Sequence, residues 1–423
     1  MNTYEGTLVV IPTRNRADLA ANAIRSVLAQ SAAAVAGVVV SDNSTDPAES
    51  SRLAAFCEAA GDARLRYVRP PQPLLMAAHW DWAASRALEL CDASHVSFLT
   101  DRIIFRDGAL AELASVSSLY PDKIVSYMHD KVADDRAPVR LQQSPWSGKL
   151  YEIASARLLY AVSQSRLHEA LPRMLNCHVP RAWLVALRAR YGNFFASTAP
   201  DFSFCFRALA SEESVLFLDE ALLCHYALSR SNGMSIVRGE VSRDNADLMA
   251  VVKSGGDFFA APIPGIVTVH NVIVHEYGVA RDETGGEKFA PLDEEKYLQT
   301  IAAELADITN PEARRAVEAQ LRARGWVAPT APPDLPLWRK LLSPSRVRGK
   351  LARALRGADG AAAAASPDEP APPIFESVED ALDYARTSRG ERVEQCPWAE
   401  YLEMKEVAWR SAPPGGALAV GTS

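Results

Sequence analysis

Residues 8–16 read LVVIPTRNR, an apolar run that stops at Pro12 and gives way to polar side chains. A continuous, largely β-branched run of this kind is typical of a strand buried on both faces, as in a parallel sheet. Apolar side chains then recur at helical spacing from Leu19 to Leu28, and Asn15 is placed to cap that helix. The segment therefore predicts a buried strand, a polar loop and an amphipathic helix.

The alternation of strand and helix continues through the first hundred residues. Further strands are predicted at 38–40, 65–68 and 96–99, and further helices at 50–60 and 76–90. This order predicts an α/β fold with a mostly parallel central sheet. Ligands on such sheets bind beyond the carboxyl ends of the strands. Polar clusters follow three of these strands, at 12–16, 41–45 and 100–102, so we expect a binding site where they meet.

Four motifs in this order resemble those of the inverting glycosyltransferases of family 2. They are VIPTRNR at 10–16, VSDNSTD at 40–46, FLTDR at 98–102 and APDF at 199–202. The resemblance covers about residues 5–240. It implies a GT-A type fold with a nucleotide-binding half at about 1–130 and an acceptor half at 131–240. It also implies transfer of a sugar from a nucleoside-diphosphate sugar, with a UDP-sugar favoured, to an acceptor hydroxyl in bacterial surface glycan synthesis.

The resemblance assigns the donor to side chains at the strand ends. It places Pro12, Arg14 and Arg16 along the base and phosphates, and Asp42 against the base. Arginine suits this role because its planar fork pairs with phosphate oxygens. His79 stands where family members often have an asparagine near the donor. In the alternative interpretation Asp42 only closes a turn, the arginines are solvated, and His79 is a packed core histidine.

The resemblance also predicts a metal site, from which this sequence departs. Family members hold Mg²⁺ or Mn²⁺ with acidic residues at the position of Asp101 and Arg102. Asp101 keeps one carboxylate, but the cation at Arg102 repels a metal ion. We therefore expect weakened or absent metal dependence, with Arg102 neutralising the diphosphate directly. Two alternatives stay open: a metal held by Asp101 and one further group such as His225, or a loss of transfer activity.

Asp201 matches the catalytic base of the family. An aspartate with an ordinary pKa of about 3.9 is ionised at neutral pH, and a base must come within roughly 3 Å of the hydroxyl it activates. The alternative is a first-turn residue that only stabilises its helix after Pro200.

Two further segments border the predicted site. Trp80 is predicted to be a core side chain. Residues 229–233 resemble a family loop that folds over the donor, although a glycine turn explains them as well.

Composition limits the classes of partner. The 423 residues carry a net charge of −7, so no global basic excess indicates nucleic-acid binding. The six cysteines are scattered and are expected to be reduced thiols. No signal peptide and no apolar window of about 20 residues is evident, so we expect a cytoplasmic protein with peripheral membrane contact at most.

The rest of the chain is predicted from its composition. Residues 241–327 form a helical extension, 328–373 a Pro/Ala-rich linker with a basic segment at 338–356, and 374–423 a segment of unknown role. The basic segment is either a solvated helix or a helix on anionic lipid, and the second would suit a lipid-linked rather than a free glycan acceptor.

Two other functions remain open. One is a nucleotidyltransferase, which is disfavoured because residues 12–18 lack the glycine that such enzymes usually carry in the loop after the first strand. The other is a non-catalytic binder of nucleotide sugars or glycans.

Overall fold

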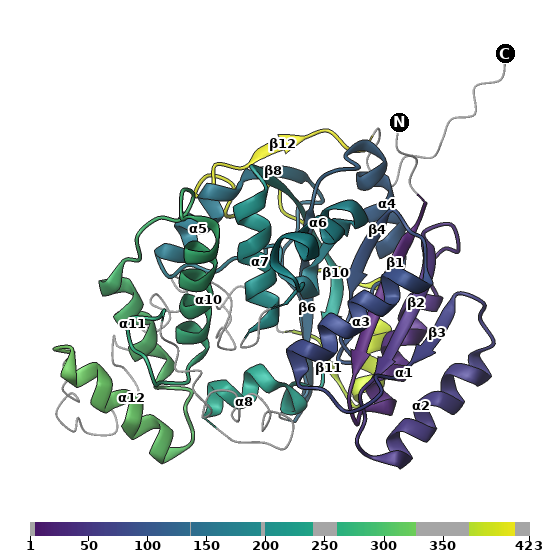
Figure 1. Ribbon diagram of the computed structural model, residues 1–423, viewed down its shortest axis with the longest axis horizontal. Helices are drawn as coiled ribbons and strands as arrows, with labels where there is room; N and C mark the ends of the chain where they lie inside the picture. Colours follow the sequence, from purple (N-terminus) through teal and green to yellow (C-terminus); the bar gives the residue numbers. More distant parts are fainter. Residues whose placement is uncertain (1–4, 136, 196–198, 240–259, 327–371, 411–423) are drawn as a thin grey trace.

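The computed structural model describes residues 5–135, 137–195, 199–239, 260–326 and 372–410. A twelve-stranded sheet runs through this part of the chain, and helices cover both of its faces (Figure 1). The main path of the sheet has the order β12-β8-β10-β6-β9-β4-β1-β2-β3, and β5, β7 and β11 attach beside it.

The predicted α/β class with its parallel core is confirmed in the first hundred residues, where β1 pairs in parallel with both β2 and β4, and β2 with β3. Leu8 and Val10 pack with α3 on one face of the sheet, whereas Val9 and Ile11 pack with α1 on the other. This alternation explains the continuous apolar run, because both faces of β1 are buried. The elements are β1 (Thr7–Thr13), α1 (Ala17–Leu28), β2 (Val35–Asp42), α2 (Pro47–Ala60), β3 (Leu65–Val68), α3 (Met76–Leu90) and β4 (His95–Phe98).

The sheet continues with mixed strand directions. β9 lies between β4 and β6 and is antiparallel to both, while β6 and β10 are parallel. Residues 215–218 read VLFL, an apolar run that predicts a short strand, but β10 (Ser214–His225) is twelve residues long. Its register against β6 shifts at Leu218 and Ala221, and the strand runs on to His225 beside the loop after β4. A four-residue apolar run underestimates such a strand, because its far end is set by pairing with β5 and β6.

The helices and strands of this second part alternate less regularly than those of the first. They are β5 (Ile103–Phe105), α4 (Ala109–Leu119), β6 (Val125–Ala133), β7 (Val139–Gln142), β8 (Leu150–Ala154), α5 (Ser155–Ser163), η1 (Met174–Asn176), β9 (Cys177–Pro180), α6 (Arg181–Tyr191), α7 (Pro200–Ser211), β10 (Ser214–His225), η2 (Leu228–Arg230) and α8 (Asn232–Arg238).

The predicted helical extension is present as α10 (Val269–Thr284), α11 (Glu294–Glu304) and α12 (Pro311–Ala323). α10 lies against α7, and Tyr277 meets Phe206 edge to face at 5.5 Å between ring centroids. The three helices also enclose a small core of their own, which includes Val272, Tyr297 and Leu321. The extension is therefore packed against the sheet domain through α10.

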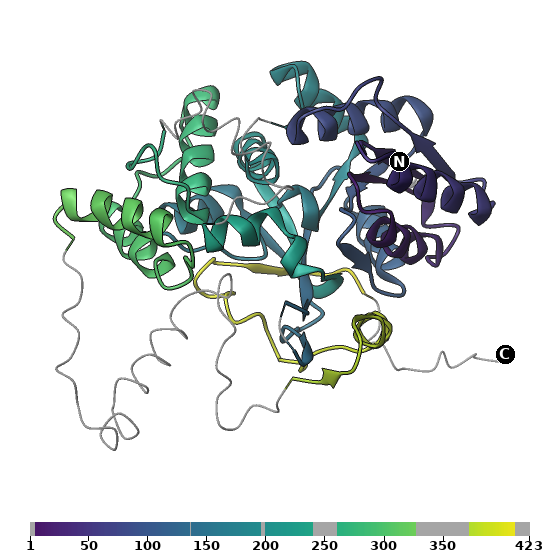
Figure 2. The ribbon, with the colours of Figure 1, turned by 90° about the horizontal axis from the view of Figure 1, so that it is seen from below.

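The C-terminal part of the chain returns to the sheet, which the sequence did not indicate. β11 (Ile374–Phe375) pairs with β7, and β12 (Lys405–Val407) pairs with β8 at the end of the main path. Between them α15 (Val378–Thr387) packs against β6 and β7 beneath the sheet (Figure 2). Residues 328–371 of the predicted linker, with the basic segment at 338–356, lie outside the described residues. Within the described residues, no helix has the length and apolarity to cross a bilayer.

Candidate active site

The loops after β1, β2 and β4 are joined by hydrogen bonds. Asn15 has a left-handed backbone (φ 55°), and its Oδ1 accepts the amides of Thr45 and Asp46, both at 2.9 Å. Thr13 Oγ1 donates to Asp101 Oδ2 at 2.9 Å, which connects the first loop to the fourth strand. The expectation that Asn15 caps α1 was wrong, because Arg16 is the N-cap and Asn15 bridges two loops instead. The three polar clusters therefore converge as predicted.

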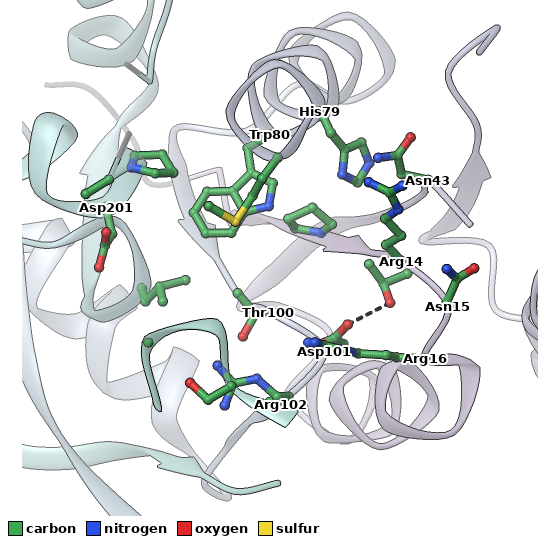
Figure 3. A pocket seen from close by; sticks show the side chains of 18 of the residues that line it. Arg14, Asn15, Arg16, Asn43, His79, Trp80, Thr100, Asp101, Arg102 and Asp201 are labelled. Carbon is green, nitrogen blue, oxygen red and sulfur yellow. Dashed lines mark hydrogen bonds and ion pairs between the residues drawn. The ribbon is translucent and has the colours of Figure 1, made fainter. Parts of the chain in front are cut away.

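A cavity of about 390 Å³ opens at these loops (Figure 3). This volume lies in the range of small-molecule sites. Seven of the eight predicted site residues line it, namely Pro12, Arg14, Arg16, His79, Asp101, Arg102 and Asp201. The structure thus brings together residues from β1, α3, the loop after β4 and α7, which are up to about 190 residues apart in sequence.

Asp42 is the predicted site residue that does not line the cavity. Its side chain is fully buried, and its carboxylate accepts hydrogen bonds from Ser50 Oγ and Tyr67 Oη, both at 2.7 Å, and from the Ser44 amide at 2.8 Å. Burial opposes its charge, but these hydrogen bonds outweigh burial and lower the pKa of Asp42. The neighbouring Asn43 lines the cavity instead. Asp42 therefore stabilises the loop after β2 from the side that faces away from the cavity.

Asn43 was missed as a site residue. Its side-chain amide donates to the Leu74 carbonyl at 2.8 Å, and its Oδ1 accepts the Leu74 amide at 2.9 Å. This double contact fixes the side chain at the cavity wall and joins the loop after β2 to the chain that enters α3. The signal was its position beside Asp42 in the same motif, but only the fold decides which of the two faces the cavity.

Two arginines flank Asp101 at the floor of the cavity. Arg16 Nη1 lies 3.4 Å from Asp101 Oδ1, and Arg16 Nη2 donates to the Arg230 carbonyl at 2.7 Å. Arg102 Nη1 lies 3.5 Å from the Tyr226 carbonyl oxygen. Burial lowers the pKa of Arg102, with Asp101 opposing the shift, but a guanidinium stays charged at neutral pH. Thr100 adds a buried hydroxyl without a hydrogen-bond partner in the described part of the chain.

These residues do not fit a divalent cation well. Asp101 already accepts hydrogen bonds from Thr13 and Arg16, and Mg²⁺ or Mn²⁺ requires several oxygen ligands. Across the ranges that the structure describes, no group of three or more His, Cys, Asp or Glu side chains is arranged to hold a metal ion. The floor of the cavity presents cationic guanidinium groups where carboxylates would be needed.

Two histidines line the cavity in different settings. His79 is 3% exposed, its Nε2 lies 2.8 Å from Ser41 Oγ, and burial lowers its pKa to about 4. It is therefore neutral at pH 7 and can serve a ligand only as a hydrogen-bonding group. His225 stacks on His129 at 4.2 Å, and its buried Nε2 has no hydrogen-bond partner within the described ranges.

Asp201 lies across the cavity from Arg14 and Asn15, as Figure 3 shows. It occupies the first turn of α7 after Pro200. Burial raises the pKa of Asp201, and the positive charge of Arg173 partly offsets that rise. A raised pKa makes the ionised carboxylate a stronger base.

Trp80 lies between these two sides of the cavity (Figure 3). The prediction of a core side chain describes only part of its environment. It meets Phe195 edge to face at 6.1 Å between ring centroids, but it also lines the cavity. Helical spacing could not reveal this, because α3 borders both the core and the cavity.

Residues 229–233, predicted as a loop or a glycine turn, instead run from the end of η2 into the start of α8 beside the strand ends. Ser231 and Gly233 line the cavity, and Arg230 Nη2 donates to the Asn15 carbonyl at 3.2 Å. The position fits the predicted covering loop. His270 and His275, by contrast, are buried on α10 and belong to the packed interior.

A family match covers the strand-end side of this site. Residues 8–166 match the family model described as glycosyl transferase family 2. This part of the chain is therefore similar to the glycosyl transferases of family 2. The matched range contains every strand-end residue described above, whereas Asp201 and α10 lie beyond it.

Two solved structures are also similar to the chain. The S. aureus TarS crystal structure is 14% identical, with a TM-score of 0.41, over 75% of this chain and 53% of that one. S. aureus TarS 1–349 in complex with UDP-GlcNAc is 14% identical, with a TM-score of 0.42, over 75% of this chain and 88% of that one. The chain thus spans about half of the first of these structures. No protein of curated function matches the chain in sequence.

Proposed function

We propose that the protein transfers a sugar from a nucleoside-diphosphate sugar to an acceptor hydroxyl, with inversion at the anomeric carbon. One observation carries this proposal: a single cavity is lined by the guanidinium groups of Arg14, Arg16 and Arg102 and by Asp201, which lies across it from Arg14 (Figure 3). Guanidinium groups complement the charge of a diphosphate, and a carboxylate opposite them can activate an acceptor.

Asp201 is the general base in this proposal. Its carboxylate takes the proton of the acceptor hydroxyl as that oxygen bonds to the anomeric carbon. The bond between this carbon and the diphosphate oxygen breaks on the opposite face, and the electron pair leaves with the nucleoside diphosphate. Approach and departure on opposite faces invert the configuration, and the separation of Asp201 from Arg14 across the cavity supports this arrangement (Figure 3).

Arg102 neutralises the departing diphosphate in place of a metal ion. The developing negative charge needs a preorganised cation, and a buried guanidinium supplies one without reorganisation of solvent. Asp101 orients Arg16 beside it rather than binding metal. The reaction is therefore expected to proceed in the presence of a chelator.

The donor is proposed to be a UDP-sugar and the acceptor a glycan or lipid-linked glycan of a bacterial surface. Trp80 lines the cavity between Asp201 and Arg14 and offers an apolar ring face on which a sugar ring can pack (Figure 3). The neutral His79 and the fixed Asn43 supply hydrogen-bonding groups near the donor side.

Incubation of the purified full chain with a panel of nucleotide sugars, in EDTA and in Mn²⁺, tests the proposal. We expect release of a nucleoside diphosphate from at least one donor, in EDTA as well as in Mn²⁺. No turnover and no UDP binding would contradict the site assignment.

Tight UDP binding without turnover of any donor would instead favour a non-catalytic binding protein. Arg102 at the place of a metal-binding carboxylate is the observation that keeps this second function in view.

A further inference from the structure

The helix that bears Asp201 lacks a cap from its own sequence. Ala199 is the N-cap of α7 and makes no side-chain cap, because a methyl group cannot accept a hydrogen bond. The first turn of a helix leaves backbone N–H groups without intrahelical partners, and these are costly when buried. Pro200 has no N–H, and the amides of Asp201 and Phe202 find acceptors within the first turn of α7. The Ala199 amide is therefore the group at the start of α7 that takes its acceptor from elsewhere in the chain.

Glu276 on α10 supplies an acceptor at this point. Its Oε1 accepts the Ala199 amide at 2.8 Å, and its side chain is only 2% exposed. Val272, one helical turn earlier on α10, lines the cavity itself. The same helix thus forms part of the cavity wall and holds the backbone two residues before Asp201.

Further contacts fix α10 against α7 away from the cavity. Arg207 on α7 makes a two-pronged ion pair with Glu283, with distances of 3.0 and 3.1 Å. Glu283 lies two turns beyond Glu276 and is partly exposed. Two polar contacts therefore join α10 to α7 and its N-cap, in addition to the apolar packing of Tyr277 on Phe206. Of the two, only the contact made by Glu276 lies next to Asp201.

We propose that Glu276 is a positioning residue for Asp201, since its carboxyl group holds the Ala199 amide and so fixes the first turn of α7. The inference rests on the proposed role of Asp201 as base. It extends the active site into the helical extension, which lies outside the matched family domain.

Glu276 is suited to this role in its neutral form. Burial raises the pKa of Glu276 to about 8, the Ala199 amide and Arg207 oppose the rise, and the charges of Asp201 and Glu283 add to it. At pH 7 the group is mostly protonated, so its carbonyl oxygen accepts the amide without a second negative charge beside Asp201. Glutamine presents the same neutral acceptor at nearly the same volume.

This suggests a comparison of Glu276→Gln and Glu276→Leu in the full chain. We expect Glu276→Leu to lower kcat about 100-fold, the loss that an ångström-scale misplacement of a catalytic group causes. Its Kd for UDP should stay near the wild-type value, because the donor side is untouched. Glu276→Gln should keep most of the wild-type kcat, because its side-chain oxygen still accepts the Ala199 amide. If Glu276 only filled space, leucine and glutamine would have similar effects.

Glu283→Ala is the matched control on the same helix. It removes the ion pair with Arg207 and should lower the melting temperature while kcat stays near wild type. If Glu276→Leu does not fold, Glu276→Asp replaces it, because one methylene less breaks the 2.8 Å contact with a smaller disturbance.

Three results would overturn the inference: a wild-type kcat in Glu276→Leu or Glu276→Asp, a loss of kcat in Glu276→Gln as large as in the other variants, or an equal loss in Glu283→Ala. A wild-type protein that turns over no donor would refute the proposed function instead, so the two failures are distinguishable.

Discussion

The two sides of the cavity are built in different ways. The strand-end side is joined by short polar contacts among loops that follow β1, β2 and β4, all within the matched domain. The side that bears Asp201 lies beyond that domain, and α10 holds it from behind. The difference teaches that donor binding can be built locally, whereas the placement of the base depends on packing between distant segments.

Asp201→Asn should have the largest effect and should separate the two sides most sharply. Loss of a general base costs about 10²- to 10⁴-fold in rate. We therefore expect kcat to fall in this range while the Kd for UDP changes little, since the arginines lie on the other side. Initial rates and calorimetry measure the two quantities. A variant that keeps full activity would remove Asp201 from the mechanism.

Acid should destabilise both sides together. Burial lowers the pKa of His79 behind the strand ends and of His270 on α10 to about 4 in each case. Unfolded histidines have a pKa near 6.5, so between about 6.5 and 4 the unfolded chain binds protons that the folded chain does not. Each of these histidines should therefore lower the free energy of unfolding as the pH falls from about 6.5 to 4, by at most about 1.4 kcal/mol per pH unit. Glu276, whose pKa burial raises to about 8, contributes a slope of the opposite sign between its unfolded pKa of about 4.3 and 8.

Urea unfolding at several pH values measures this slope, and His79→Gln should reduce it. The difference in slope between the wild type and His79→Gln isolates the contribution of His79 from that of Glu276. A slope that His79→Gln leaves unchanged would assign the effect to histidines away from the strand ends.

Arg102→Gln tests the donor side alone. Hydrogen bonds to charged groups contribute about 1.5–3 kcal/mol, so the Kd for UDP in EDTA should rise roughly 10- to 100-fold. Arg102→Lys keeps the charge but loses the planar fork and should give a smaller rise. Calorimetry at two salt concentrations checks both variants. Unchanged binding in Arg102→Gln would show that the diphosphate lies elsewhere.

Thr13→Val should have the smallest effect. It removes the hydrogen bond to Asp101 that connects the loops after β1 and β4. A single hydrogen bond contributes about 1 kcal/mol, so the Kd for UDP should rise only a few-fold. The melting temperature is the accompanying control. A loss of binding as large as that of Arg102→Gln would mean that the strand-end side is less rigid than its contacts indicate.

The strand-end side was predictable because its signals are local. The buried runs of β1 and β2 and the polar residues after them follow directly from short-range pattern and from the geometry of parallel sheets. The convergence of Arg14, Arg16, Asp101 and Arg102 could therefore be inferred without coordinates. The orientation of Asp42 could not, because its partners Ser50 and Tyr67 come from α2 and β3.

The other side was only partly predictable. The resemblance placed Asp201 at a helix start, but Glu276 and Val272 reach it from more than seventy residues further along the chain. The same holds for the return of β11 and β12 to the sheet, since two- and three-residue strands carry no periodicity. Contacts of this kind follow from tertiary packing, which no local pattern encodes.

A crystal structure of the full chain with a bound UDP-sugar in EDTA would test the central claim most directly. The account predicts diphosphate oxygens within hydrogen-bonding distance of Arg102 and the anomeric carbon between the diphosphate and the Asp201 carboxylate. A nucleotide bound outside this cavity, or a diphosphate turned toward Asp201, would contradict it.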